Sequence, residues 1–367
     1  MMAGCGSSSE NAGTGSSGTE EVQGKLDVSA VTEYRYDLYI ADDGTFEGVK
    51  ALDYVTLPED IDSISFKDAA VDIDQTTVEQ AMDYIKQNYG DKIPYDGKAE
   101  LGHGVLINYE GTVDGVIFQG GTASDVELVL GSGQYLSDFE NGIVGHSAGD
   151  VFDINVLFPD GYGSSQDING NEVVLSNKTA VFKITLKEIY EFGISATNIA
   201  VALDDLNMNA AEYGYPIDEE GLRELISDRI ALSNRRSLVE DYLLSNSTVK
   251  EVPTVITDSI ISYEGAYIQT GAQQYGYDNI DQFIQMYGYE SFAQYINTVE
   301  ESIIAEAENV LIRQAVAEHF GIKVGDAEKI STFGSLDAYD NEVLQMGEKL
   351  AVQEALYTAA VDQLINK

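Results

Sequence analysis

The feature that most constrains the fold of this chain is a change of hydrophobic period near residue 195. Between residues 104 and 192, short runs alternate apolar and polar side chains and are separated by Gly-rich turns, which is typical of antiparallel strands. These runs cover residues 105–109, 126–130, 152–158 and 180–189, with a hairpin turn at Asp114-Gly115. Beyond Ser195 the apolar residues recur at helical spacing, as in residues 222–230 and 303–315, before Gly321 supplies a stop. The pattern predicts an α+β multi-domain chain with a central antiparallel sheet and short helix, followed by an all-α domain.

The chain is long enough for several domains. Its 367 residues exceed the roughly 100–200 residues of one ordinary domain. We expect an N-terminal linker at residues 1–26, a small α/β segment at 27–100, the β-domain at 101–192 and the helical domain at 193–367. The linker is rich in Gly, Ser, Thr and Glu, and such a composition cannot bury a core.

Local patterns in residues 27–100 predict one strand and one helix. Apolar side chains alternate with polar ones over residues 33–40, which is typical of a half-buried strand. The sequence Thr76-Thr77-Val78-Glu79 has the pattern of a capping box that opens a helix. A last helix is expected from Leu336 to Ile365.

The single cysteine, Cys5, stands in the sequence MMAGCGSSS. Small residues before a cysteine and a Gly/Ser tract after it resemble the end of a bacterial lipobox with its tether. The resemblance implies a lipid anchor on Cys5 that holds the protein to the cell membrane outside the cytoplasm. We expect the signal peptide of such a protein to be missing from this sequence. The alternative is a free cysteine in a cytoplasmic protein.

The charge of the chain excludes several partners. It has 63 Asp and Glu against 20 Lys and Arg, a net charge of −43. Such a surface repels phosphate backbones, so we expect no nucleic-acid partner.

The three histidines, His103, His146 and His319, do not have the spacing of metal ligands, and we expect neither a metal nor any other cofactor. Residues 167–172 have the wrong spacing for a calcium loop, and a solvated turn is the favoured interpretation.

A series of short motifs follows in order through the predicted β-domain. They are INYEG at 107–111, VDG at 113–115, FQGG at 118–121, LVLGSG at 128–133, FENGIVG at 139–145, FPDGY at 158–162 and AVFKI at 180–184. Together they resemble the FKBP-type peptidyl-prolyl cis-trans isomerase family, in its trigger-factor branch. The resemblance implies an FKBP-like sheet and rotation about X-Pro bonds.

The resemblance also implies the site residues. The catalytic positions fall on Tyr109, Phe118, Leu136, Phe139, Tyr162 and Phe182, and the substrate-binding positions on Val126, Tyr135 and Gln119. In the family the residue at Leu136 donates its backbone N–H to the substrate carbonyl, and the aromatic residue at Phe139 forms the pocket floor. An aromatic residue at strand spacing is more often plain core, so the joint order of these residues carries the prediction.

Three departures from the family pattern weaken the catalytic prediction. Gln119 replaces the usual acid, Ser137-Asp138 replaces Pro-Gly or Arg-Gly, and Phe139 stands where many relatives have Trp. We expect Asp138 to cap the short helix at Phe139. Two alternatives follow from these departures: a catalytically weak or inactive peptide-binding holdase, and a surface adhesion or scaffold protein that uses the same fold.

Residues from about 196 to 330 resemble the trigger-factor C-terminal domain. The motifs are VPTVI at 252–256, VLIRQAVAE at 310–318 and GIKV at 321–324. The resemblance implies helical arms that hold unfolded or newly exported polypeptides containing X-Pro bonds. A tyrosine-rich stretch between residues 263 and 295 either contacts such peptides or packs between helices. The basic Gly-Phe-Arg loop with which the family docks to ribosomes is absent before residue 100, so we expect no ribosome binding.

Overall fold

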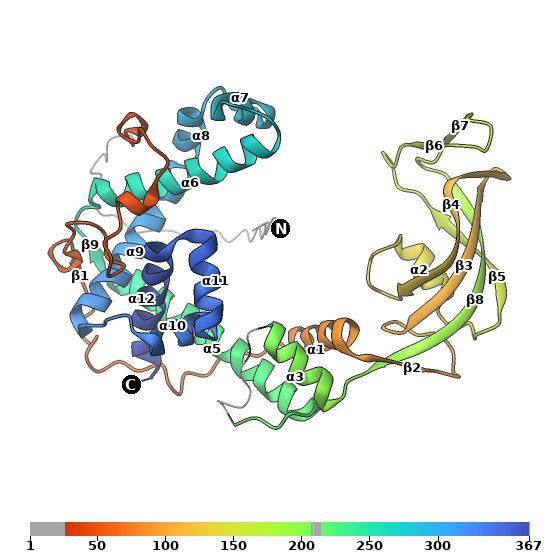
Figure 1. The fold of residues 1–367 in the computed structure, drawn as a ribbon, viewed down its shortest axis with the longest axis horizontal. Coiled ribbons are helices and arrows are strands. Elements are labelled where there is room, and N and C mark those ends of the chain that lie inside the picture. The colour runs from red at the N-terminus through yellow and green to blue at the C-terminus, as the bar shows by residue number, and fades with distance from the viewer. Residues whose placement is uncertain (1–25, 207, 209–213, 367) are drawn as a thin grey trace, which may run out of the picture. The chain divides into compact units, whose positions relative to one another are not determined.

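The computed structural model describes residues 26–206, 208 and 214–366. Two compact units contain them (Figure 1). Unit 1 comprises Met1–Leu57 and Ser247–Gly321, and unit 2 comprises Pro58–Asn246 and Ile322–Lys367. The predicted lipidation site, Cys5, lies outside the described residues. The domain boundaries expected from the sequence stay a prediction.

Unit 2 contains a five-stranded antiparallel sheet. Its strands are β2 (Asp91–Pro94), β3 (Gly104–Val113), β4 (Val116–Val129), β5 (Val151–Leu157) and β8 (Thr179–Gly193). Their order is β2-β8-β3-β4, and β5 also pairs with β8. A separate small hairpin joins β6 (Ser164–Gln166) to β7 (Glu172–Val174). The four strands predicted from alternation within the β-domain are confirmed.

The turn between β3 and β4 explains why these strands pair directly. Asp114 and Gly115 have φ of 51° and 81°. Positive φ at both central residues is the geometry of a tight hairpin turn, whose twist matches that of the strands. Asp-Gly is a favoured pair for such a turn, so this hairpin was predictable from the sequence.

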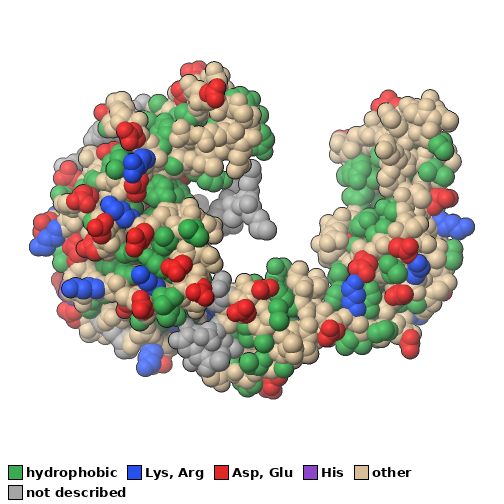
Figure 2. Space-filling model, in the orientation of Figure 1, with side chains coloured by type: hydrophobic (Ala, Val, Ile, Leu, Met, Phe, Trp, Pro, Cys, Tyr) green, Lys and Arg blue, Asp and Glu red, His purple; other side chains and the backbone are tan. Residues whose placement is uncertain are grey.

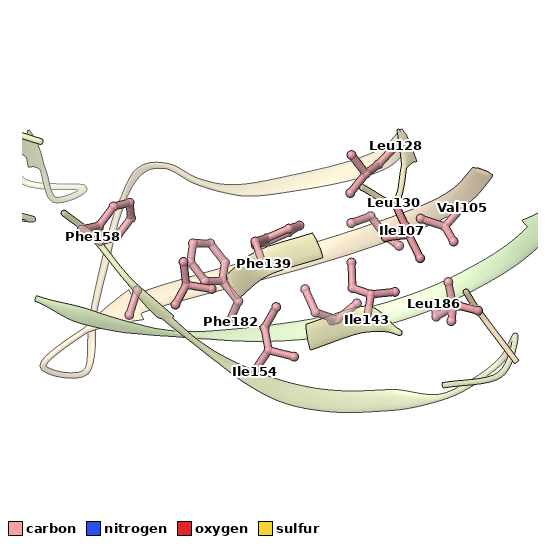
Figure 3. Packing of buried hydrophobic residues seen from close by; sticks show 14 of the residues in the cluster. Val105, Ile107, Leu128, Leu130, Phe139, Ile143, Ile154, Phe158, Phe182 and Leu186 are labelled. Atoms are coloured by element: carbon pink, nitrogen blue, oxygen red, sulfur yellow. The ribbon is translucent and has the colours of Figure 1, made fainter. Parts of the chain in front are cut away.

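One face of the sheet is covered by the short helix α2 (Ser137–Ile143), as Figure 1 shows. Side chains at alternate positions of β8, among them Phe182, Ile184 and Leu186, are buried in the core between the helix and the sheet. In Figure 3 the labelled rings of Phe139, Phe158 and Phe182 lie toward one end of this core. The aliphatic side chains of Val105, Leu130 and Leu186 lie toward the other. The aromatic end is where the candidate site is found.

Helices complete unit 2. They are α1 (Gln75–Tyr89), α3 (Ala196–Asp205), α5 (Glu219–Asn246), α10 (Asp326–Phe333), α11 (Leu336–Met346) and α12 (Glu348–Ile365). Apolar side chains of α1, α3 and α5, including Met82, Ile199 and Leu222, form one buried cluster. A second cluster joins α10, α11 and α12 around Tyr339 and Ala351.

Two sequence predictions in unit 2 need correction. The single helix expected from Leu336 to Ile365 is divided into α11 and α12 by Gly347, whose φ of 86° and ψ of 151° are not helical. The start of α1 is capped by Asp74, whose carboxylate accepts from the Thr76 N–H at 2.9 Å, and not by a Thr76 capping box. Both aspartate and threonine suit this position, and the helix begins two residues earlier than the pattern indicated.

Unit 1 is mainly helical. Its elements are the 3-10 turns η1 (Val28–Ala30), η2 (Tyr36–Leu38), η3 (Ala51–Asp53) and η4 (Gln285–Tyr287), the strands β1 (Val55–Thr56) and β9 (Thr248–Val249), and the helices α6 (Thr254–Gln274), α7 (Ile280–Ile284), α8 (Phe292–Thr298) and α9 (Glu300–Phe320). Helix α9 ends at Gly321, with a φ of 63°, as the sequence predicted. Its Gln314 joins the two chain segments, because its side chain accepts from the Phe46 N–H and donates to the Val49 carbonyl.

The strand predicted at residues 33–40 is wrong. This segment contains the 3-10 turn η2 and a single bridge between Ile40 and Phe46. Its alternating side chains pack on helices: the Tyr34 ring lies 5.3 Å from Phe292, and the Tyr36 ring 5.4 Å from Tyr263. The alternation therefore records contact with a helical surface, which periodicity alone does not distinguish from a sheet.

None of the helices in the described part of the chain combines the length and the apolar character needed to cross a membrane.

Candidate active site

A cavity of about 490 Å³ opens at the aromatic end of the β-domain core. Its walls come from β3, β4, β5, β8, α2, the loop before α2, and the segment from 158 to 175 that carries the β6–β7 hairpin. The lining residues are Tyr109, Phe118, Gln119, Gly120, Gly133, Gln134, Tyr135, Leu136, Phe139, Val156, Phe158, Tyr162, Leu175 and Phe182. Most of these side chains are apolar, so the cavity can take a small hydrophobic ring out of water.

The aromatic rings that line this cavity pack against one another. The Phe139 ring lies 5.4 Å from Tyr109, 4.9 Å from Tyr135 and 5.2 Å from Phe182, measured between ring centroids. The contacts with Tyr109 and Phe182 are edge-on, whereas Tyr135 stacks. Offset and edge-on pairs are the favourable arrangements of aromatic rings. Phe118 belongs to the same cluster, because its ring makes edge-on contacts with Phe158 and Phe182.

The phenol of Tyr109 is the titratable group that the cavity perturbs clearly. Burial raises the pKa of Tyr109 to about 12, and a hydrogen bond with Tyr135 adds to the shift. A phenol with this pKa stays neutral at every physiological pH, so it can donate a hydrogen bond but cannot act as an anionic base.

The loop before α2 is organised by Glu140. This side chain is only 3% exposed. Its carboxylate accepts backbone N–H groups from Gly131 at 2.8 Å, Gly133 at 3.2 Å and Tyr135 at 2.9 Å. Buried carboxylates need such donors, and here the donors belong to the loop that forms one side of the cavity. Glu140 therefore fixes the shape of the site without lining it, and sequence reasoning missed this residue.

The backbone N–H of Leu136 lies at the start of α2, in the wall of the cavity. No acceptor among the described residues pairs with it. Helix N-termini leave their first N–H groups without intrahelical partners. The site thus offers one backbone donor beside an apolar wall.

The opposite side of the cavity belongs to the segment that carries the β6–β7 hairpin. Tyr162 is 50% exposed, and its ring lies 4.6 Å from Phe158. The Ser165 hydroxyl donates to the Gln119 carbonyl at 2.8 Å. This bond joins the hairpin to β4 at the mouth of the cavity.

The structure brings nearly all of the sequence-predicted site residues together. Tyr109, Phe118, Gln119, Tyr135, Leu136, Phe139, Tyr162 and Phe182 line the same cavity. Val126 does not line it, and packs partly buried against the core. Val156, Phe158 and Leu175 line it and were not predicted as site residues. Val156 on β5 and Phe158 directly after the strand are two positions apart, as expected of side chains on one face. This spacing indicates burial, but it does not distinguish the wall of a cavity from a closed core. The roles of all these residues stay predictions.

Asp138 does not cap α2 as predicted. The helix begins at Ser137, with Leu136 in the capping position, and the Asp138 carboxylate accepts from the Leu157 N–H at 3.1 Å. Asp138 therefore connects α2 to the end of β5.

The loop from 167 to 172 forms the hairpin turn between β6 and β7. The Asp167 carboxylate accepts from the Asn171 side-chain amide and from the backbone N–H groups of Asn171 and Asn169, each at 2.8 Å, and these bonds lower its pKa. Within residues 26–206, 208 and 214–366, no group of three or more His, Cys, Asp or Glu side chains is placed to hold a metal ion.

Comparison with known proteins gives matches over this domain and beyond it. Residues 95–187 match the model of the family described as FKBP-type peptidyl-prolyl cis-trans isomerase. A trigger factor from Clostridium kluyveri is 29% identical over 70% of this chain and 58% of its own length. One from Ligilactobacillus salivarius is 26% identical over 84% of this chain and 67% of its own length. One from Streptococcus pyogenes is 34% identical over 46% of this chain and 36% of its own length.

The chain therefore spans less than two thirds of the length of the first of these relatives. A solved structure of the trigger factor chaperone overlaps 85% of this chain at 19% identity, with a TM-score of 0.32. Because that score is low, the relationship rests on the sequences. Residues 95–187 thus match an FKBP-type domain, and most of the chain is similar in sequence to trigger factors.

Proposed function

We propose that this protein is a peptidyl-prolyl cis-trans isomerase and folding chaperone that uses the aromatic cavity to speed rotation about X-Pro bonds. Rotation faces a barrier of ~18–20 kcal/mol, because amide resonance is lost at the twisted midpoint. The reaction needs no nucleophile and no acid. It needs a site that binds the twisted amide better than the planar one.

The observation that carries the proposal is the apolar, aromatic cavity with an unpaired backbone donor in its wall. In this proposal a prolyl ring lies against Tyr109, Phe139 and Phe182, whose rings pack on one another in the lining of the cavity. The Leu136 N–H, which pairs with no acceptor among the described residues, would donate to the substrate carbonyl, and a donor in a dry site is worth more than one in water. Loss of water also weakens the resonance that keeps the amide planar, because the charge-separated form is less well solvated.

A refolding assay tests the proposal. The refolding of an unrelated protein that is limited by proline isomerisation should accelerate with catalytic amounts of this chain. Phe139→Ala and Phe182→Ala should lose most of the acceleration, whereas Tyr84→Ser, at an exposed position on α1, should keep it. No acceleration by the native chain, or acceleration that survives both cavity variants, removes the isomerase proposal.

The second candidate function is a holdase that binds peptides without catalysing rotation. It is favoured by Gln119, where the family pattern has an acid, and by Phe139, where many relatives have Trp. The two candidates separate in one experiment: a holdase suppresses aggregation of an unfolded client and leaves proline-limited refolding unchanged.

We also propose that the clients are exported proteins and that Cys5 tethers this protein to the outer side of the membrane. The small residues and the Gly/Ser tract around Cys5 support the anchor. In the native host, a radiolabelled fatty acid should be incorporated into the protein and not into a Cys5→Ser variant. Equal labelling of both, or of neither, contradicts the anchor.

We propose further that the protein works away from the ribosome, which agrees with a net charge of −43 that ribosomal RNA repels. Co-sedimentation with ribosomes at low salt would overturn this part alone.

A further inference from the structure

Tyr135, in the loop before α2, brings a phenol hydroxyl to the lining of the cavity. Among the described residues, that lining consists of apolar side chains, phenols, amides and glycines, without any Asp, Glu, His, Lys or Arg. Figure 2 shows mostly green and tan atoms between the positions that Figure 1 labels β6 and α2. A carbonyl that enters this cavity therefore meets hydroxyl, amide and backbone N–H groups in place of a charged partner.

Three contacts fix the position of Tyr135. Its backbone N–H donates to the buried Glu140 carboxylate at 2.9 Å. Its ring stacks on Phe139, with the centroids 4.9 Å apart and the ring planes inclined by 22°. The edge contact with the Tyr109 ring has a centroid distance of 6.2 Å, and the two phenols share a hydrogen bond. Because backbone, ring and hydroxyl are all held, Tyr135 loses little conformational entropy when its hydroxyl binds a ligand.

The hydrogen bond between the two phenols has a direction. Burial and the bond with Tyr135 both raise the pKa of Tyr109. A hydrogen bond raises the pKa of a phenol when the phenol donates, because the protonated form is then stabilised. Tyr109 therefore donates to the Tyr135 oxygen. The hydrogen of the Tyr135 hydroxyl is left over, and no acceptor in the part of the chain that the structure describes pairs with it.

The bond from Tyr109 also makes Tyr135 a better donor. A hydroxyl that accepts one hydrogen bond is polarised by it and donates the next one more strongly. Tyr135 and Leu136 are adjacent residues, and both line the cavity. The loop thus offers two donors, a hydroxyl and a backbone N–H. An X-Pro segment carries one carbonyl before the ring and one on the proline itself, so it can use both.

We infer that the Tyr135 hydroxyl is a second hydrogen-bond donor to a carbonyl of the bound X-Pro segment, and that Tyr109 is a positioning residue that acts through it. The inference rests on the proposed function of the cavity as an X-Pro site. It applies to a holdase as well as to an isomerase, because the carbonyl is bound in either case.

Tyr-to-Phe variants of the full chain test the inference, because each keeps its ring and loses one oxygen. The probe is a short labelled peptide with one X-Pro bond, and anisotropy of the label gives its affinity. Tyr135→Phe should bind the peptide about tenfold more weakly, through the loss of one hydrogen bond. Tyr109→Phe should bind it about threefold more weakly, because the remaining Tyr135 hydroxyl is no longer polarised. The control Tyr84→Phe, at a 55% exposed position on α1, should bind as the native chain does.

The double variant Tyr109→Phe/Tyr135→Phe tests whether Tyr109 acts through its neighbour. It should bind no more weakly than Tyr135→Phe alone, since the effect of Tyr109 depends on the hydroxyl that is already gone. A double variant in which the two losses multiply overturns the inference, because Tyr109 then contacts the peptide independently. A Tyr135→Phe chain that binds as tightly as the native one overturns it as well.

Infrared spectroscopy of the bound peptide gives a readout that a merely structural role of Tyr135 would not move. The peptide carries an isotope-labelled carbonyl, first before the proline and then on it. One of the two labelled carbonyls should absorb at a lower frequency on the native chain than on Tyr135→Phe, because a hydrogen bond weakens the C=O bond. Equal frequencies on both chains, for both labels, contradict the inference.

Exchange NMR between the cis and trans peptide on the same preparations reports separately on catalysis. Binding without exchange removes the isomerase, and the affinities and carbonyl frequencies still decide the inference. A peptide that neither binds nor exchanges removes the proposed function of the cavity and the inference together.

Discussion

Burial raises the pKa of the Tyr109 phenol to about 12, and the sign of this shift makes stability depend on pH above 10. The phenol ionises near 10 in the unfolded chain, so between pH 10 and 12 the unfolded state has lost this proton while the folded state keeps it. The contribution of Tyr109 to stability is therefore complete below pH 10 and is lost as the pH rises to 12.

Tyrosine-selective carbon NMR checks this prediction. The resonance that disappears in Tyr109→Phe should titrate near pH 12, and in Tyr135→Phe it should move toward 10, because one of the two causes of the shift is removed. A Tyr109 resonance that titrates at 10 in the native chain would contradict the desolvated site.

Glu140 is the residue whose removal should disturb the cavity without touching a ligand. Glu140→Ala leaves the buried N–H groups of Gly131, Gly133 and Tyr135 without their acceptor, and should destabilise the β-domain by roughly 3 kcal/mol. Glu140→Gln retains one acceptor oxygen and should cost less. Urea unfolding followed by circular dichroism measures the loss, and an Ala variant as stable as the native chain would show that water replaces the carboxylate.

Single residues also show what the sequence could and could not predict about the site. Tyr109, Phe139 and Phe182 come from motifs that follow in a recognisable order, and they line one cavity; their roles stay predictions. Val126 lies outside the cavity lining, because one alternating run does not say which end of a core opens to solvent. Glu140 was missed because its function depends on three N–H groups of a folded loop, and no local pattern marks it.

Among the elements, α5 and α12 are joined by a partly buried ion pair. Arg236 donates Nε and Nη2 to the two oxygens of Asp362, both at 2.7 Å, and Ser331 on α10 also donates to Asp362. A buried pair contributes little compared with apolar packing, but one charge left alone is costly.

Asp362→Ala should therefore destabilise unit 2 by roughly 3 kcal/mol, because it leaves the guanidinium without its partner. The double change Arg236→Met/Asp362→Leu should recover much of that loss. Thermal unfolding of the native chain and the two variants decides between these accounts. A double variant less stable than Asp362→Ala would mean that the pair itself, and not the unpaired charge, carries the energy.

Hydrophobic periodicity located some secondary-structure elements correctly and was misleading for others. Alternation located β3, β4, β5 and β8, because a half-buried sheet imposes it directly. The same alternation at residues 33–40 came from packing on α6 and α8, and Gly347 interrupts a helical pattern whose apolar spacing continues on both sides. For residues 33–40, the deciding contacts are with helices far away in the sequence. At Gly347, the deciding feature is the conformation of one backbone residue.

For the whole molecule, the assembly of unit 1 from two distant chain segments was beyond the sequence. Residues Val55 and Val249 pair as β1 and β9, and the Gln314 side chain bonds the backbone at Phe46 and Val49. Two-residue strands and one glutamine give no signal that specifies so distant a partner. Composition did predict the acidic surface, and that surface supports the proposal that the protein works away from the ribosome.

The most direct test of the central claim is two-dimensional exchange NMR on a short peptide with one X-Pro bond. With catalytic amounts of the native chain, cis and trans resonances should exchange within a second, whereas uncatalysed exchange takes tens to hundreds of seconds. Phe139→Ala should abolish the exchange peaks. Peptide resonances that broaden on binding while cis and trans never exchange would contradict the isomerase and leave the cavity a binding site alone.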